Sequence, residues 1–108
     1  MINIVETQLE NCFIINLTKR VDNRGSFIKI FEKDCFSKNN LATDFHETYY
    51  TSSNKDVIRG MHFQLPPADQ EKLVHCASGE VLDVVVDLRK HSKTYGHCLL
   101  YTSDAADE

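Results

Sequence analysis

Three polar side chains on neighbouring predicted strands could carry out proton transfer beside a carbonyl group. His62 and Arg59 lie in the run 57–67, and Lys72 begins the strand that follows. Removing such a proton requires a base that titrates near neutral pH, and histidine is the side chain that does so without help from its surroundings. A fixed cation must also stand where the enolate oxygen gathers charge, and lysine can act there as a compact donor. The pattern therefore indicates enolate chemistry.

Each of these residues also has a simpler interpretation. A lone histidine is weak evidence for a site, because it is more often a buried side chain bonded to a neighbouring carbonyl. Lys72 follows Glu71 and could form a surface ion pair with it, while Arg59 could be a solvated arginine at a strand end. Gly60 lacks a Cβ, so backbone or a ligand could approach closely beside Arg59. Spacing alone leaves both interpretations open.

Short β-rich stretches separated by polar turns predict an all-β sandwich or barrel. The predicted strands cover residues 12–17, 27–31, 47–51, 57–63, 72–76 and 81–88, and only residues 34–40 could form a helical turn or two. In the last strand, Asp83 and Asp87 share one face of the pleat. In a barrel strand, His62 and Gln64 would also share a face and would meet a ligand together if that face lined the lumen.

Length, charge and cysteine spacing limit the class of protein. The 108 residues predict a single domain, and a net charge of -4 argues against a general nucleic-acid binder, which needs clustered cations. The four cysteines form no CxxC pair, so neither a zinc knuckle nor a redox dithiol is indicated. The sequence shows no secretory signal and no apolar run long enough for a membrane span, so we expect a cytoplasmic location and no membrane partner.

A tight turn is predicted at residues 22–25. Asp22 can close an Asx-turn there, which would present Arg24 at the loop tip. The exposed guanidinium could bind a phosphate group or only solvent.

An ordered series of motifs resembles the dTDP-4-dehydrorhamnose 3,5-epimerase family over about residues 16–96. The matching segments are residues 22–27, 59–64, 66–67, 72–74, 79, 83–89 and 92–96. The resemblance implies a cupin-type double-stranded β-helix, or jelly roll, that is incomplete at its C-terminus. It further implies an isomerase of deoxysugar (rhamnose) biosynthesis, which inverts C3, C5 or both beside the ketone of a nucleotide-linked 4-keto-6-deoxy sugar.

The resemblance assigns roles to five residues. His62 matches the general base of the family and Lys72 its enolate-stabilising lysine. Arg59 and Arg24 match contacts to the substrate and its diphosphate, and Phe27 matches an aromatic residue of the nucleotide-contacting segment. No cofactor is implied, and the expected partner is a dTDP-linked sugar.

Other candidate residues are less typical of the family. Glu47 and Tyr49 stand where the family often has glutamine and asparagine, and Lys29 stands where it often has glutamate. We count these three and Gln64 as candidate substrate contacts. Asp83 is expected to face the lumen and to orient the lysine or the histidine. These departures keep open a non-catalytic sugar-nucleotide-binding cupin, a single-carbon epimerase or a ketoisomerase.

A metal site is the main chemical alternative, because His62, Glu71 and His75 are possible ligands. Metal-binding cupins place two histidines two residues apart on one strand, but the second position here is Gln64. Since amides are poor ligands for transition metals, we predict no metal.

The C-terminal segment is expected to differ in origin from the rest. Residues 1–97 read as the N-terminal part of an epimerase-like domain, whereas residues 98–108 resemble translated sequencing-adapter read-through, with a natural acidic tail as the alternative. The family's tyrosine acid and the acidic partner of its histidine would then lie downstream. Family members are homodimers that exchange N-terminal strands, so we expect a homodimer at full length.

Overall fold

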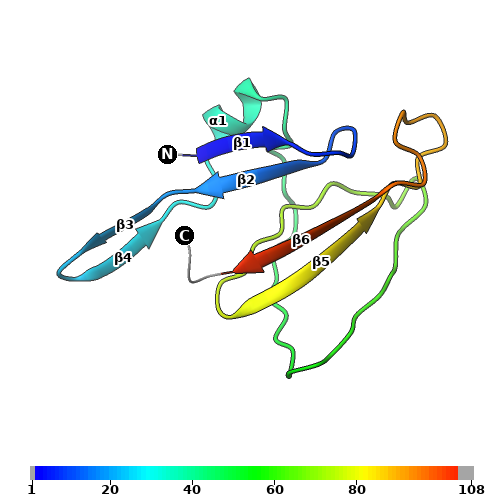
Figure 1. Ribbon diagram of the computed structural model, residues 1–108. Coiled ribbons are helices and arrows are strands. Elements are labelled where there is room, and N and C mark those ends of the chain that lie inside the picture. Colours follow the sequence, from blue (N-terminus) through cyan, green and yellow to red (C-terminus); the bar gives the residue numbers. More distant parts are fainter. Residues whose placement is uncertain (1, 105–108) are drawn as a thin grey trace.

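Six strands pair as three antiparallel hairpins in the computed structural model, which describes residues 2–104 (Figure 1). The elements in chain order are β1 (Ile2–Glu6), β2 (Phe13–Leu17), β3 (Lys19–Asp22), β4 (Gly25–Ile28), α1 (Lys33–Lys38), β5 (Glu80–Val86) and β6 (Cys98–Asp104). Sequence neighbours pair, β1 with β2 and β3 with β4, whereas β5 pairs with β6 across a longer connection. No helix in the described part of the chain is long and apolar enough to cross a membrane.

The helical turn predicted at residues 34–40 is confirmed as α1. Asp34 lies in its first turn and Lys38 in its last, so both charges complement the helix dipole. Phe36 on this helix is 1% exposed, and its ring packs edge to face on Phe31 with centroids 4.7 Å apart. Phe31 makes a second such contact with Phe45, at 5.6 Å. This aromatic cluster anchors the chain where it leaves β4.

Three of the predicted strands are confirmed and three are wrong. β2, β4 and β5 overlap the predictions at residues 12–17, 27–31 and 81–88, although β4 begins and ends two or three residues earlier than expected. The predicted strands at residues 47–51, 57–63 and 72–76 lie instead in a coil that runs from α1 to β5 (Figure 1). Their β-branched and aromatic residues favour an extended backbone, but a strand also needs a neighbour to bond with, and none lies beside these segments in residues 2–104.

Apolar side chains remain widely exposed. Among the described residues, only Leu9, Phe36 and Asp87 are buried, while Val21 is 72% and Ile58 92% exposed. The β3–β4 and β5–β6 hairpins are exposed over most of their residues, whereas β1–β2 is mostly half-buried, so much of the apolar surface is left uncovered within residues 2–104.

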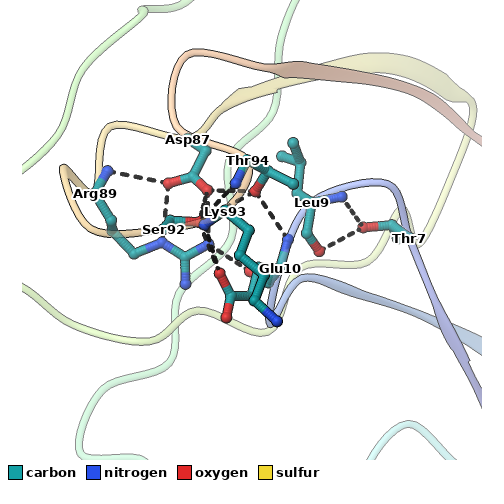
Figure 2. A network of polar contacts seen from close by, with 8 residues as sticks. All are labelled: Thr7, Leu9, Glu10, Asp87, Arg89, Ser92, Lys93 and Thr94. Atoms are coloured by element: carbon teal, nitrogen blue, oxygen red, sulfur yellow. Dashed lines mark hydrogen bonds and ion pairs between the residues drawn. The ribbon is translucent and has the colours of Figure 1, made fainter.

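A polar cluster, which we call the Asp87 cluster, joins the β1–β2 loop to the β5–β6 connection (Figure 2). The Asp87 carboxylate accepts hydrogen bonds from Arg89 Nε at 2.9 Å and from the Ser92 and Thr94 hydroxyls at 2.6 Å each. These bonds hold the pKa of Asp87 far below its usual range, and the bond from Arg89 contributes most. The carboxylate is 4% exposed and fully supplied with donors, as a buried charge must be.

Glu10 brings the N-terminal hairpin into the same cluster. Its backbone N–H donates to Thr94 Oγ1 at 3.1 Å, and its carboxylate accepts the backbone N–H of Lys93 at 2.9 Å. Arg89 also donates to the Glu10 carbonyl. The bond from Lys93 is the largest of the influences that lower the pKa of Glu10. Two parts of the chain about eighty residues apart are therefore fixed to each other by polar contacts.

Candidate functional site

The β3–β4 hairpin presents Arg24 at its tip. Asp22 Oδ1 accepts the backbone N–H of Arg24 at 2.8 Å, which confirms the predicted Asx-turn. The same carboxylate accepts Arg24 Nη2 at 2.7 Å, although the Arg24 side chain is 87% exposed. The guanidinium is foremost among the groups that lower the pKa of Asp22. Arg24 is thus oriented by its own turn while most of its donors face solvent.

Phe27 shares an open concavity with Arg24. The concavity has a volume of about 450 Å³ and is lined by Arg20, Val21, Asp22, Arg24, Gly25, Ser26 and Phe27. Arg20 stands opposite Phe27 in the β3–β4 register, and Phe27 is 61% exposed. Two guanidinium groups and an aromatic ring suit a ligand that combines phosphate with a planar base. This concavity brings together two of the predicted contacts, Arg24 and Phe27.

Arg59 is held by the preceding loop. Its Nε donates to Ser53 Oγ at 2.8 Å and its Nη2 donates to the backbone carbonyl of Ser52 at 3.1 Å. These two bonds fix the plane of the guanidinium and leave its remaining donors available. Arg59 is exposed and held by these two bonds, and its role as a substrate contact stays a prediction.

His62 lies two residues further along the coil, with its imidazole close to the backbone of Gly60. A Cβ placed on Gly60 would lie 3.1 Å from His62 Nδ1. Backbone or a ligand was expected to approach Gly60, whereas the nearest group in the structure is the His62 imidazole. His62 and Gln64 are both exposed, and they lie in the coil rather than on the barrel strand that was predicted.

Lys72 is exposed, and within residues 2–104 it forms no hydrogen bond or ion pair, so the surface pair with Glu71 is not formed. Asp83 on β5 stands opposite Tyr101 of β6 and makes no bond to Lys72 or His62 in the described chain. Its orienting role stays a prediction.

The remaining candidates lie on exposed coil. Glu47 and Tyr49 are exposed, Tyr49 by 67%. Lys29 follows β4 and pairs with Glu32 at 3.5 Å, with both side chains about half exposed. No cluster of three potential metal ligands occurs among the described residues.

Sequence reasoning missed two sets of supporting residues. Ser53 lies between two predicted strands and was given no role, and Ser92 and Thr94 were included only in the matching segment 92–96. The sequence did contain a signal for Ser92 and Thr94. Asp87 ends an apolar strand, Arg89 follows two residues later, and the two hydroxyl residues come shortly after it. The signal for Ser53 was absent, because the fold of a loop decides which serine meets Arg59.

Comparison with known proteins identifies the family. The sequence profile described as dTDP-4-dehydrorhamnose 3,5-epimerase matches residues 6–107. The chain is 38% identical over 95 residues to the dTDP-4-dehydrorhamnose 3,5-epimerase of Shigella flexneri, covering 87% of this chain and 52% of that protein. It is 40% identical over 92 residues to the enzyme of that name from Methanothermobacter thermautotrophicus, covering 85% and 49%. The chain thus spans about half the length of the curated relatives it matches.

Two solved structures agree with this result. The crystal structure of dTDP-4-dehydrorhamnose 3,5-epimerase from Elizabethkingia anophelis matches with a TM-score of 0.88 and 36% identity, over 96% of this chain and 57% of that one. The enzyme from Bacillus anthracis, solved with TDP and PPi bound, matches with a TM-score of 0.89 and 29% identity, over 97% and 61%. These matches confirm the cupin-type fold, of which this chain forms part. The chain belongs to the dTDP-4-dehydrorhamnose 3,5-epimerase family.

Proposed function

We propose that the complete protein containing this chain epimerises C3, C5 or both of a nucleotide-linked 4-keto-6-deoxy sugar. The observation that carries the proposal is the ordered set of Arg59, His62 and Lys72 in a chain that belongs to this family. A histidine base and a lysine cation are the two groups that enolate chemistry requires first.

In the proposed reaction, His62 removes the proton from a carbon beside the ketone. The electron pair of the broken C–H bond becomes the double bond of an enolate, and the carbonyl oxygen takes up the negative charge. Lys72 stabilises this oxygen. An acid on the opposite face, which we expect from the rest of the complete protein, returns a proton and inverts the carbon. Since no electrons are gained or lost, the reaction requires no redox cofactor.

We propose that Arg24, Arg59 and Phe27 bind the nucleotide part of the substrate. The exposed concavity on β3–β4 supports this role, because it combines cationic donors with an aromatic face. The Bacillus anthracis relative with TDP and PPi bound supports a thymidine diphosphate group in particular. Glu47, Tyr49 and Lys29 would then adjust which base or sugar is accepted.

We also propose a homodimer in which the β3–β4 hairpin packs against a second subunit. A two-stranded hairpin is marginally stable alone, and this one projects from the rest of the molecule (Figure 1). Arg24 and Phe27 would then contribute to the partner's site. Light scattering of the complete protein would measure its mass, and a monomer would exclude a shared site.

Solvent deuterium exchange tests the catalytic proposal. The complete protein should incorporate deuterium into a dTDP-linked 4-keto-6-deoxy sugar at C3 or C5, as followed by NMR of the sugar. Binding of the sugar without exchange at either carbon would favour the alternative, a non-catalytic sugar-nucleotide-binding cupin. Exchange at one carbon alone would favour a single-carbon epimerase, and conversion to a 3-keto sugar would favour a ketoisomerase.

A further inference from the structure

The His62 imidazole lies close to the position that a side chain on residue 60 would occupy. A Cβ on Gly60 would lie 3.1 Å from His62 Nδ1, 3.4 Å from its backbone nitrogen and 3.6 Å from its Cε1. A carbon at 3.1 Å from a ring atom is inside ordinary van der Waals contact, so the ring would have to shift by a few tenths of an ångström. The imidazole could therefore not keep its present position if residue 60 carried a side chain.

This contact is specific to Gly60. Gly79 also has a positive φ, +81° against +97° for Gly60, but a Cβ there would meet nothing within 4 Å. The backbone conformation favours glycine at both positions. Only at Gly60 does the missing side chain also make room for a neighbouring residue.

The contact bears on the proposed base because it limits where the imidazole can lie, in addition to the acidic partner that the family resemblance places downstream. His62 is exposed, and within residues 2–104 its side chain forms no hydrogen bond or ion pair. The ring atoms nearest to the Cβ position of Gly60 are Nδ1 and Cε1, so Nε2 is the ring nitrogen farther from Gly60. A base must be held within hydrogen-bond reach of the proton it removes, and small misplacements reduce the rate steeply.

We propose that Gly60 is a positioning residue for His62: its bare backbone is the surface on which the imidazole rests, with Nε2 directed away from it toward substrate. This inference rests on the proposed role of His62 as the base. It adds a reason why the position beside Arg59 carries glycine, and it assigns proton abstraction to Nε2.

The test compares Gly60→Ala with Gly79→Ala in the complete protein. Both substitutions place an L-residue at positive φ and should lower the thermal midpoint, Gly60→Ala by more because its methyl group also meets the imidazole. Gly60→Ala alone should lower kcat for deuterium exchange, by roughly tenfold or more, with KM within about twofold. It should also move the Cε1–H NMR resonance of His62, which His62→Asn identifies by its disappearance, whereas Gly79→Ala should leave that resonance in place.

A double-mutant cycle gives a second readout that needs no activity. If the new methyl group conflicts with the imidazole, Gly60→Ala should cost less stability in a His62→Ala background than in the wild type, so the two effects should not add. This measurement applies even where Gly60→Ala alone folds poorly. Additive effects, an unmoved His62 resonance, or equal losses of kcat in both glycine variants would each overturn the proposal. A wild-type protein that exchanges no deuterium would instead refute the proposed function, and the NMR and stability measurements would still decide the role of Gly60.

Discussion

Replacing Ser53 by alanine should weaken binding of the nucleotide without slowing proton transfer. The Ser53 hydroxyl accepts Arg59 Nε at 2.8 Å and is one of two groups that hold the guanidinium. A hydrogen bond to a charged group contributes about 1.5–3 kcal/mol when water is excluded. Because this one is exposed, we expect about 1 kcal/mol, which corresponds to roughly a fivefold weaker affinity.

Ser52→Ala is the matched control. Ser52 holds Arg59 through its backbone carbonyl, at 3.1 Å from Nη2, so removal of its side chain leaves that bond in place. Isothermal titration of the complete protein with TDP should show the weaker affinity for Ser53→Ala, near wild-type affinity for Ser52→Ala, and recovery in Ser53→Thr, which keeps the hydroxyl. The kcat for deuterium exchange should stay within about twofold in all three. Unchanged TDP affinity in Ser53→Ala, or an equal loss in Ser52→Ala, would refute the assigned role of this bond.

Three further outcomes are expected. His62→Asn should reduce deuterium exchange by about a hundredfold or more while the protein stays folded, as circular dichroism would verify, and a rate near wild type would exclude His62 as the base. Hydrogen bonds hold the pKa of Asp87 in the folded state below its ordinary value of 3.8. The Asp87 carboxylate should therefore stabilise the fold fully above pH 3.8, and this stabilisation should be lost as the pH falls below 3.8. Urea midpoints measured from pH 7 to pH 3 should decline more steeply in the wild type than in Asp87→Asn. The 108-residue chain alone should show no stereochemical inversion. It should also aggregate readily, because apolar residues such as Val21 and Ile58 are exposed. Cooperative unfolding together with turnover would contradict both expectations.

Local signals predicted the parts of the fold that local chemistry determines. The Asx-turn at Asp22, the short helix α1 and the alternating strand β5 each follow from residues within a few positions of one another. The predictions of strands at residues 47–51, 57–63 and 72–76 are wrong because strand formation there does not depend on local residues alone. Their composition favours extension, but pairing depends on a distant neighbour that composition does not specify.

At the candidate site, too, local sequence signals predict some features and leave those that depend on loop geometry undetermined. The motif order selected Arg59, His62 and Lys72, whose roles stay predictions, and the missing Cβ of Gly60 suggested an approach by backbone or a ligand there. Which group approaches Gly60, and which serine holds Arg59, depends on loop geometry that no periodicity reports. The segment 98–104 forms β6 and pairs along β5, while residues 105–108 lie outside the described residues; the non-native origin of residues 98–108 stays a prediction.

The Asp87 cluster also sets an order of events during synthesis. The β1–β2 hairpin is local and can form within about 1–10 μs once its residues are free. Its polar partner Ser92 lies 82 positions after Glu10, so at about 5–20 residues per second it is synthesised roughly 4–16 s later. For that interval the first hairpin, which is only marginally stable alone, lacks the contacts of the Asp87 cluster. Those seconds are when its unpaired strand edges are most open to contact with other nascent chains.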